Sequence, residues 1–177
     1  MARSVVPLPV DPALPLAAGL VDSNGLAALV APWFGPRIDG VRVRYLEYRP
    51  GSWLRVQLAV DTPDGAGAAV VQQEAGAAVS VWRYPDDPGL PALAAHAGGG
   101  ADLLAWVPGR RAVLRTGEQV IKFHDDAASL RQAVLALELV STVLPAPAVL
   151  EVREAERAYV QGAVAGRALA RADAAAV

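Results

Sequence analysis

The chain has 177 residues and a net charge of −2 at pH 7, a length that suits one domain or two small ones with real cores. It contains no cysteine and only two histidines, which excludes disulfides, thiolate metal sites and cysteine nucleophiles. The slight negative charge, with a pI near 5.7, argues against a general binder of nucleic acid.

Residues 1–21 are expected to form an irregular leader. Its mildly apolar run is interrupted by Pro7, Pro9, Pro12 and Pro15 before it could form the core of a signal peptide. No stretch of the chain approaches the roughly 20 apolar residues of a membrane span. We therefore expect a soluble, cytoplasmic protein with no membrane partner.

An N-terminal helix and a β meander are predicted next. Residues 24–34 fit a short helix, capped by Asp22 or Ser23 and ended by Gly35 and Pro36. From residue 41 the apolar period changes to two, which is typical of strands. Turn sequences separate four such runs, which predicts a four-stranded antiparallel meander. The runs are 41–48, 53–60, 69–75 and 78–84.

Four arginines gather in the first part of this meander: Arg42, Arg44, Arg49 and Arg55. A solvated sheet face is the ordinary explanation for such a cluster. Phosphate or nucleic-acid binding is the alternative, and the net charge of the chain disfavours it.

The composition changes after residue 84. Residues 85–102 have prolines and paired acids early and three glycines late, which is typical of a connector. We expect His96, within it, to be a solvated loop residue. The first predicted domain is therefore 1–84, containing the helix and the meander, and the connector is 85–102.

Three strands, a helix and two more strands are predicted after the connector. The strand runs are 103–107, 110–115, 119–124, 148–153 and 158–164. Asp125 or Asp126 can cap a helix over 127–143. Apolar residues recur on it at helical spacing, at Leu130, Val134 and Leu137. His124-Asp125-Asp126 is accordingly interpreted as a strand end and a helix cap, not as a catalytic loop. The predicted fold class is α+β.

Lys122, in the third of these strands, is the only lysine among the 16 lysine and arginine residues. A lysine ammonium is a compact charge on a flexible stem, which suits a phosphate group. The alternative is an ordinary edge-strand residue whose stem lies along apolar surface.

The order of these elements resembles the amino-terminal lobe of the protein-kinase-like fold, and specifically that of the aminoglycoside phosphotransferases and maltokinase-like small-molecule kinases. VIKF at 120–123 resembles that family's lysine strand. Glu138 in LALELV, 16 residues on (138 − 122), resembles the helix glutamate that holds the lysine in place and keeps it protonated beside the phosphates. An ordinary strand-to-helix salt bridge is the alternative for this pair.

Two further segments carry the resemblance. WVPGRRAVLR at 106–115 is similar to the family's first hairpin, whose tight turn lies over the phosphates. AYVQGAVAGRAL at 158–169 is similar to the strand and hinge whose main chain bonds adenine. The nucleotide contacts that the resemblance implies, beside Lys122 and Glu138, are Gly109, Arg110, Tyr159, Val160, Gln161 and Gly162. Turn, surface and core-strand roles are the alternatives for these residues.

The resemblance implies a kinase-like nucleotide-binding lobe of about five antiparallel strands and one packed helix over 103–165, and the start of a carboxy-terminal lobe over 166–177. The implied activity is transfer of the ATP γ-phosphate to a hydroxyl of a sugar, aminoglycoside or similar molecule, with magnesium. In the family, a His-Gly-Asp loop, an asparagine and a metal-binding aspartate follow in the second lobe.

Val177 precedes any such motif. We therefore expect this chain to contain no catalytic residue and no magnesium ligand, to lack the acceptor site, and to be inactive alone. The alternative is a non-catalytic ligand- or partner-binding α+β module, whose exposed lobe face would favour self-association.

Overall fold

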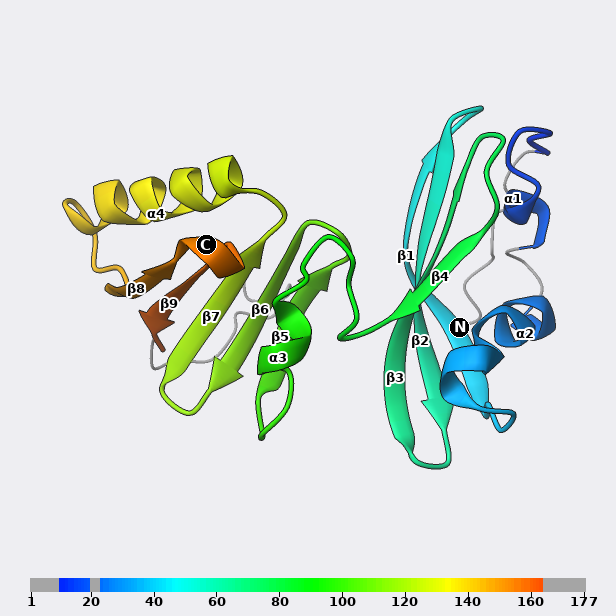
Figure 1. Cartoon of the computed structure of the whole chain (residues 1–177), viewed down its shortest axis with the longest axis horizontal. Coiled ribbons are helices and arrows are strands. Elements are labelled where there is room, and N and C mark those ends of the chain that lie inside the picture. The colour runs from blue at the N-terminus through cyan, green and yellow to red at the C-terminus, as the bar shows by residue number, and fades with distance from the viewer. Residues whose placement is uncertain (1–9, 20–22, 164–177) are drawn as a thin grey trace, which may run out of the picture. The chain divides into compact units, whose positions relative to one another are not determined.

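The computed structural model describes residues 10–19 and 23–163. The expectations for the start of the leader, for Val164 and for 166–177 lie outside these residues. The chain divides into two compact units, Met1–Pro88 and Gly89–Val177, and each is described by itself (Figure 1). Each unit contains one antiparallel sheet with a few helices, which confirms the predicted α+β class.

The first unit is the predicted meander with helices on one face of the sheet. Its elements are α1 (Leu16–Gly19), α2 (Ser23–Phe34), β1 (Gly40–Arg49), β2 (Trp53–Thr62), β3 (Gly65–Glu74) and β4 (Ser80–Arg83). Neighbouring strands pair in chain order. Every second residue of β2, from Leu54 to Val60, is fully buried and packs with Leu26 and Val30 of α2, as the period of two predicts.

The leader is not irregular throughout, because four of its residues form α1 and Leu14 lies in the core. Asp11 fastens the leader to the β1–β2 turn. Its carboxylate accepts hydrogen bonds from the Gly51 amide (2.8 Å) and the Tyr48 hydroxyl (2.9 Å). These bonds, that of Gly51 first, lower the pKa of Asp11. Prolines exclude a long helix here but permit a single helical turn directly after Pro15.

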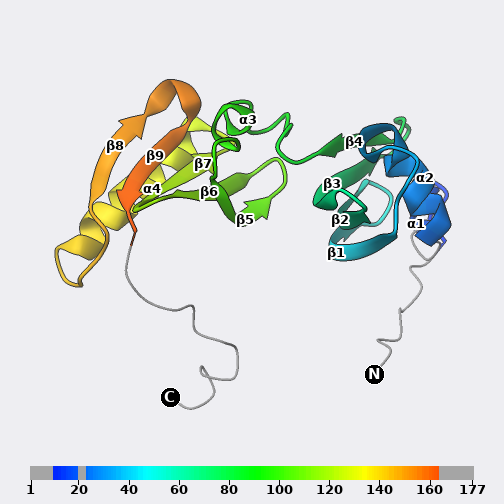
Figure 2. The same ribbon diagram turned by 90° about the horizontal axis from the view of Figure 1, so that it is seen from below.

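The second unit has five strands in the order β5-β6-β7-β9-β8. Its elements are α3 (Leu93–His96), β5 (Asp102–Val107), β6 (Arg111–Thr116), β7 (Gln119–His124), α4 (Ala127–Ser141), β8 (Val149–Arg153), a 3₁₀ turn (Glu154–Glu156) and β9 (Ala158–Gly162). All neighbouring strands are antiparallel. The last strand of the chain therefore lies between β7 and β8, and both Figure 1 and Figure 2 show this.

Helix α4 begins at the predicted cap. The Asp126 carboxylate accepts a hydrogen bond from the Ser129 amide at 2.7 Å, which confirms the interpretation of His124-Asp125-Asp126 as strand end and cap. The helix packs against β7, β8 and β9, with Leu130 buried. Within residues 10–19 and 23–163, no helix is long and apolar enough to cross a membrane.

Candidate functional site

Lys122 shares one face of β7 with Val120 and His124, because side chains alternate along a strand. Strand pairing sets Lys122 opposite Tyr159 and Val120 opposite Gln161 on β9. Side chains of directly paired residues point to the same face of a sheet. Two strands thus present one set of neighbouring side chains, which we call the Lys122 row: Val120, Lys122, His124, Tyr159 and Gln161.

The Lys122 ammonium is positioned by an aromatic ring. Its Nζ lies 5.5 Å from the centroid of the Tyr159 ring, and Tyr159 is itself buried. A cation over a ring face is attracted by the ring quadrupole but keeps its charge. Among the ion pairs of the described residues none includes Lys122. Lys122 is thus a partly buried lysine whose charge no described carboxylate neutralises.

Glu138 does not meet Lys122 in this structure. It lies on α4 with its side chain exposed, and within 10–19 and 23–163 no ion pair joins it to Lys122. The more buried side of α4 contains Leu130, Val134 and Leu137 instead. A spacing of 16 residues allows a lysine on a strand and a glutamate on the next helix to come close. It does not determine which side of the helix faces the strand.

His124 is a member of the row that sequence reasoning assigned only to a strand end. Its ring stacks on Tyr159, with centroids 5.8 Å apart and an interplanar angle of 18°. Its Nε2 is buried and has no hydrogen-bond partner among the residues that the structure describes. Burial lowers the pKa of His124, and the charges of Lys122 and Arg111 lower it further, against the opposing effect of Asp125 and Asp126. Because side chains alternate along β7, the position of His124 two residues after Lys122 predicts that both side chains lie on the same face.

The β5–β6 turn, predicted to lie over phosphates, is partly covered by the connector. Gly109 has φ of 69°, which favours glycine. A Cβ added to Gly89 would lie 2.6 Å from the Gly109 Cα and 2.7 Å from its carbonyl oxygen, so the two backbones touch. Arg110 is exposed, and its carbonyl accepts a hydrogen bond from the Asp125 amide at 2.9 Å. One side of the turn is therefore occupied by the chain itself.

The segment predicted to bond adenine through its main chain lies inside the sheet. Residues 159–161 pair with β7 on one side and with β8 on the other. Their main-chain N–H and C=O groups are therefore used in the hydrogen bonds between these strands. The Gly162 amide donates to the Ala148 carbonyl at 3.3 Å. The side chains of Tyr159 and Gln161 are themselves buried, and the Gln161 Oε1 has no hydrogen-bond partner among the described residues.

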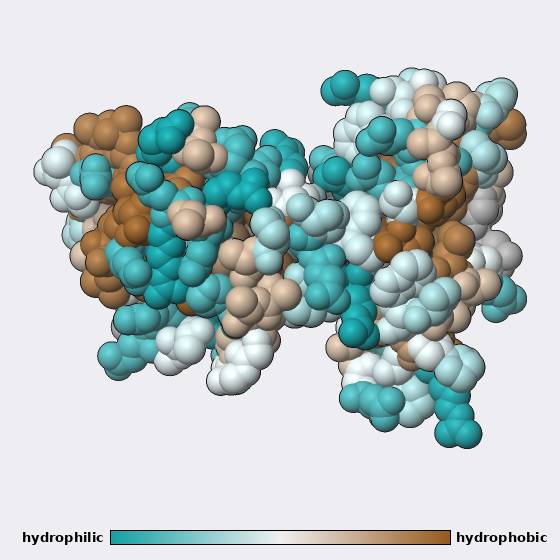
Figure 3. Space-filling view, in the orientation of Figure 1, coloured by the Kyte–Doolittle hydropathy of each residue, from teal (hydrophilic) through white to brown (hydrophobic). Residues whose placement is uncertain are grey.

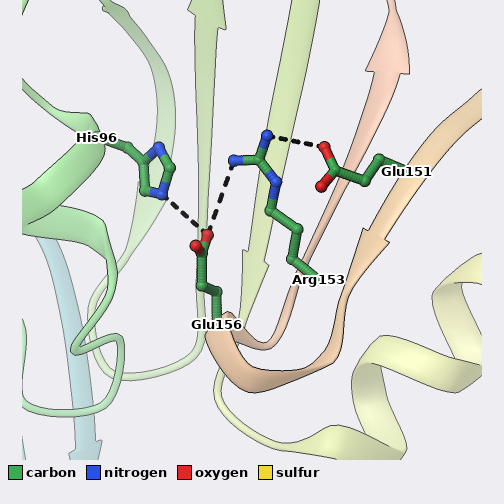
Figure 4. A network of polar contacts seen from close by, with 4 residues as sticks. All are labelled: His96, Glu151, Arg153 and Glu156. Carbon is green, nitrogen blue, oxygen red and sulfur yellow. Dashed lines mark hydrogen bonds and ion pairs between the residues drawn. The ribbon is translucent and has the colours of Figure 1, made fainter.

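Figure 4 shows a polar network of His96, Glu151, Arg153 and Glu156. It lies on the face of β7 opposite the Lys122 row, because His96 packs on Phe123 and Phe123 alternates with Lys122 along the strand. His96 Nε2 lies 2.9 Å from Glu156 Oε2, and Arg153 lies 3.7 Å from Glu156 and 2.8 Å from Glu151. The His96 ring also packs on Phe123, with centroids 5.5 Å apart. The expectation of a solvated His96 is therefore wrong. The partners are 60 residues apart, so no local sequence pattern could have shown the contact.

The described residues hold no group of three or more His, Asp or Glu side chains that could bind a metal ion. Comparison of the chain with protein-family models, with curated proteins and with solved structures gave no match. Any functional assignment therefore depends on the chain's own residues.

Proposed function

We propose that the second unit binds ATP at the Lys122 row, as the N-terminal part of an ATP-dependent small-molecule phosphotransferase. One observation carries the proposal: the strand register places the only lysine of the chain over Tyr159, on one face with Val120, with no carboxylate paired to it in the described residues. The order of three strands, helix and two strands supports it, since this is the order of the kinase-like lobe that the sequence resembles.

Lys122 would bind the phosphates. A flexible, half-exposed ammonium serves as a point charge for a polyanion. Tyr159 would position the Lys122 ammonium, because Glu138 is exposed and does not reach Lys122 in this structure. Tyr159 is buried on β9, the strand between β7 and β8, and its ring would position the ammonium. Glu138 is thereby left without a part in nucleotide binding by this chain.

The base would lie over Val120 and Gln161. Val120 supplies apolar surface, as the second residue before the family's lysine does. The buried Gln161 Oε1, which has no hydrogen-bond partner among the described residues, would supply an acceptor for an exocyclic amine after a rotation of the side chain that exposes it. Main-chain contacts to the base are not assigned to this segment, since 159–161 are paired on both sides and the Gly162 amide donates to the Ala148 carbonyl.

The transfer step is not assigned to this chain. The catalytic loop, the magnesium ligands and the acceptor site would belong to the carboxy-terminal lobe that the resemblance implies. The property proposed for the second unit is therefore nucleotide binding, which can be measured without turnover. The proposal places the chain in the cytoplasm, where ATP is available.

Titration with Mg-ATP tests the proposal on three proteins. Wild type should bind, and Lys122→Met should bind at least about tenfold more weakly, because a charge-assisted contact is lost. Glu138→Gln is the matched control and should bind like wild type. Absence of binding by wild type, or equal affinities for wild type and Lys122→Met, would show that the Lys122 row is not a nucleotide site.

A further inference from the structure

Strand β8 is an edge of the second sheet. Among the described strands it pairs with β9 on one side and with none on the other. An edge strand presents a row of unpaired N–H and C=O groups, which form a template for another strand. The other edge, β5, begins with Asp102 and has a register shift between Leu103 and Ala105, as β8 has between Val149 and Glu151.

Apolar side chains are exposed around the β8 edge. Leu150 and Val152 on β8 are 55% and 44% exposed. The C-terminal part of α4 and the loop after it add further exposed residues, Leu139, Val140, Val143 and Leu144. Figure 3 shows hydrophobic surface gathered at the α4 end of this unit. Apolar residues grouped in this way are typical of an interaction surface, unlike single exposed leucines.

We propose that β8 pairs with β8 of a second copy of this chain, antiparallel and about a two-fold axis through Val152. In that register Glu151 lies opposite Arg153 of the second copy, and Arg153 lies opposite its Glu151. The charges of β8 are thus complementary to themselves. A partner related by a two-fold axis presents the same residues in reverse order. The Glu-Val-Arg pattern then pairs each glutamate with an arginine, which favours a second copy of this chain as the partner of β8.

The neighbouring like-charge registers are unfavourable. A two-fold axis through Glu151 would set two glutamates opposite each other, and an axis through Arg153 would set two arginines opposite each other. The register shift between Val149 and Glu151 confines the regular part of β8 to residues 151–153. The complementary register is therefore centred on the regular part of the strand.

An ion pair within one chain already holds the Glu151 and Arg153 side chains together at the β8 edge. Arg153 Nη2 lies 2.8 Å from Glu151 Oε2 within one chain, with both side chains partly exposed at the sheet edge (Figure 4). Pairing would join the two copies in a ring of four alternating charges. A two-fold axis perpendicular to the sheet also keeps α4 of both copies on one face, beside the shared edge. Three regular residues per strand make a small interface, so association should depend on concentration.

Sedimentation velocity over roughly 1 μM to 1 mM tests the proposal. Wild type should move from the 18.3 kDa of one chain towards twice that mass. Glu151→Arg sets arginine against arginine and should remain a monomer, and Arg153→Glu should do the same through paired glutamates. An equimolar mixture of these two variants should form dimers again, because one copy then presents two arginines and the other two glutamates.

The mixing result separates pairing from a loss of folding, since a misfolded variant would not be restored by its counterpart. Val152→Lys should abolish the dimer and Leu104→Lys, on the other edge strand, should not. Lys122→Met should dimerise like wild type, because nucleotide binding is a separate property. A wild type that stays monomeric throughout, a failure of the mixture to dimerise, or association that survives Glu151→Arg would overturn the proposal.

Discussion

The partly buried imidazole of His124 is expected to make the second unit sensitive to pH. Its Nε2 has no hydrogen-bond partner within residues 10–19 and 23–163, and burial lowers the pKa of His124. In the unfolded chain the pKa is about 6.5. A lowered folded-state pKa means that the unfolded state takes up the proton first, so stability is complete above pH about 6.5 and declines as the pH falls through the folded-state pKa.

His124→Phe should remove this decline. Phenylalanine keeps the stack on Tyr159 but does not titrate, so the free energy of unfolding should change less than that of wild type between about pH 6.5 and 5. Urea unfolding followed by Trp106 measures it, because the other three tryptophans lie in the first unit and can be replaced by phenylalanine. An equal loss of stability in wild type and variant would show that other groups cause the decline.

At the scale of elements, Gly89 of the connector packs closely against Gly109 of the β5–β6 turn. Gly89→Ala should destabilise the second unit by about 1–3 kcal/mol, because the new Cβ meets backbone atoms that cannot move independently. Gly98→Ala is the control, since a Cβ there meets nothing within 4 Å. Thermal unfolding checks both, and equal melting temperatures for the two variants would contradict the contact.

The period of the apolar residues predicted most elements of the fold. Alternation in 53–60 and 119–124 gave β2 and β7, and Asp126 marked the start of α4. Helix α1 was missed because its four residues are too few to show a period. The place of β9 between β7 and β8 depends on packing of the whole sheet, which no local pattern records.

The site was predictable only in part. The rarity of lysine drew attention to Lys122, and strand alternation places Val120 and His124 beside it. Tyr159 was assigned to a hinge, and its contact with the ammonium depends on the pairing of β7 with β9. Glu138 was selected by its distance along the chain, whereas the exposed direction of its side chain follows from the way α4 packs.

At the scale of the whole molecule, the charge distribution argues against binding of nucleic acid. Two of the arginines in the first meander are engaged with acids: Arg42 lies 3.1 Å from Asp61, and Arg55 lies 3.8 Å from Glu47. The net charge of the chain is −2. Titration with an oligonucleotide should therefore give a flat response at every salt concentration. Binding that weakens as salt increases would contradict this account.

The central claim is that the Lys122 ammonium contacts the phosphates of a nucleotide, and the single lysine of the chain allows a direct measurement. In protein made with ¹³C-lysine, NMR shows the Cε of Lys122 as the only lysine signal of its kind. Addition of Mg-ATP should shift this signal in a saturable way, and adenosine, which lacks phosphates, should shift it far less. A Cε signal that stays unchanged up to saturating Mg-ATP, or that responds equally to adenosine, would contradict the claim.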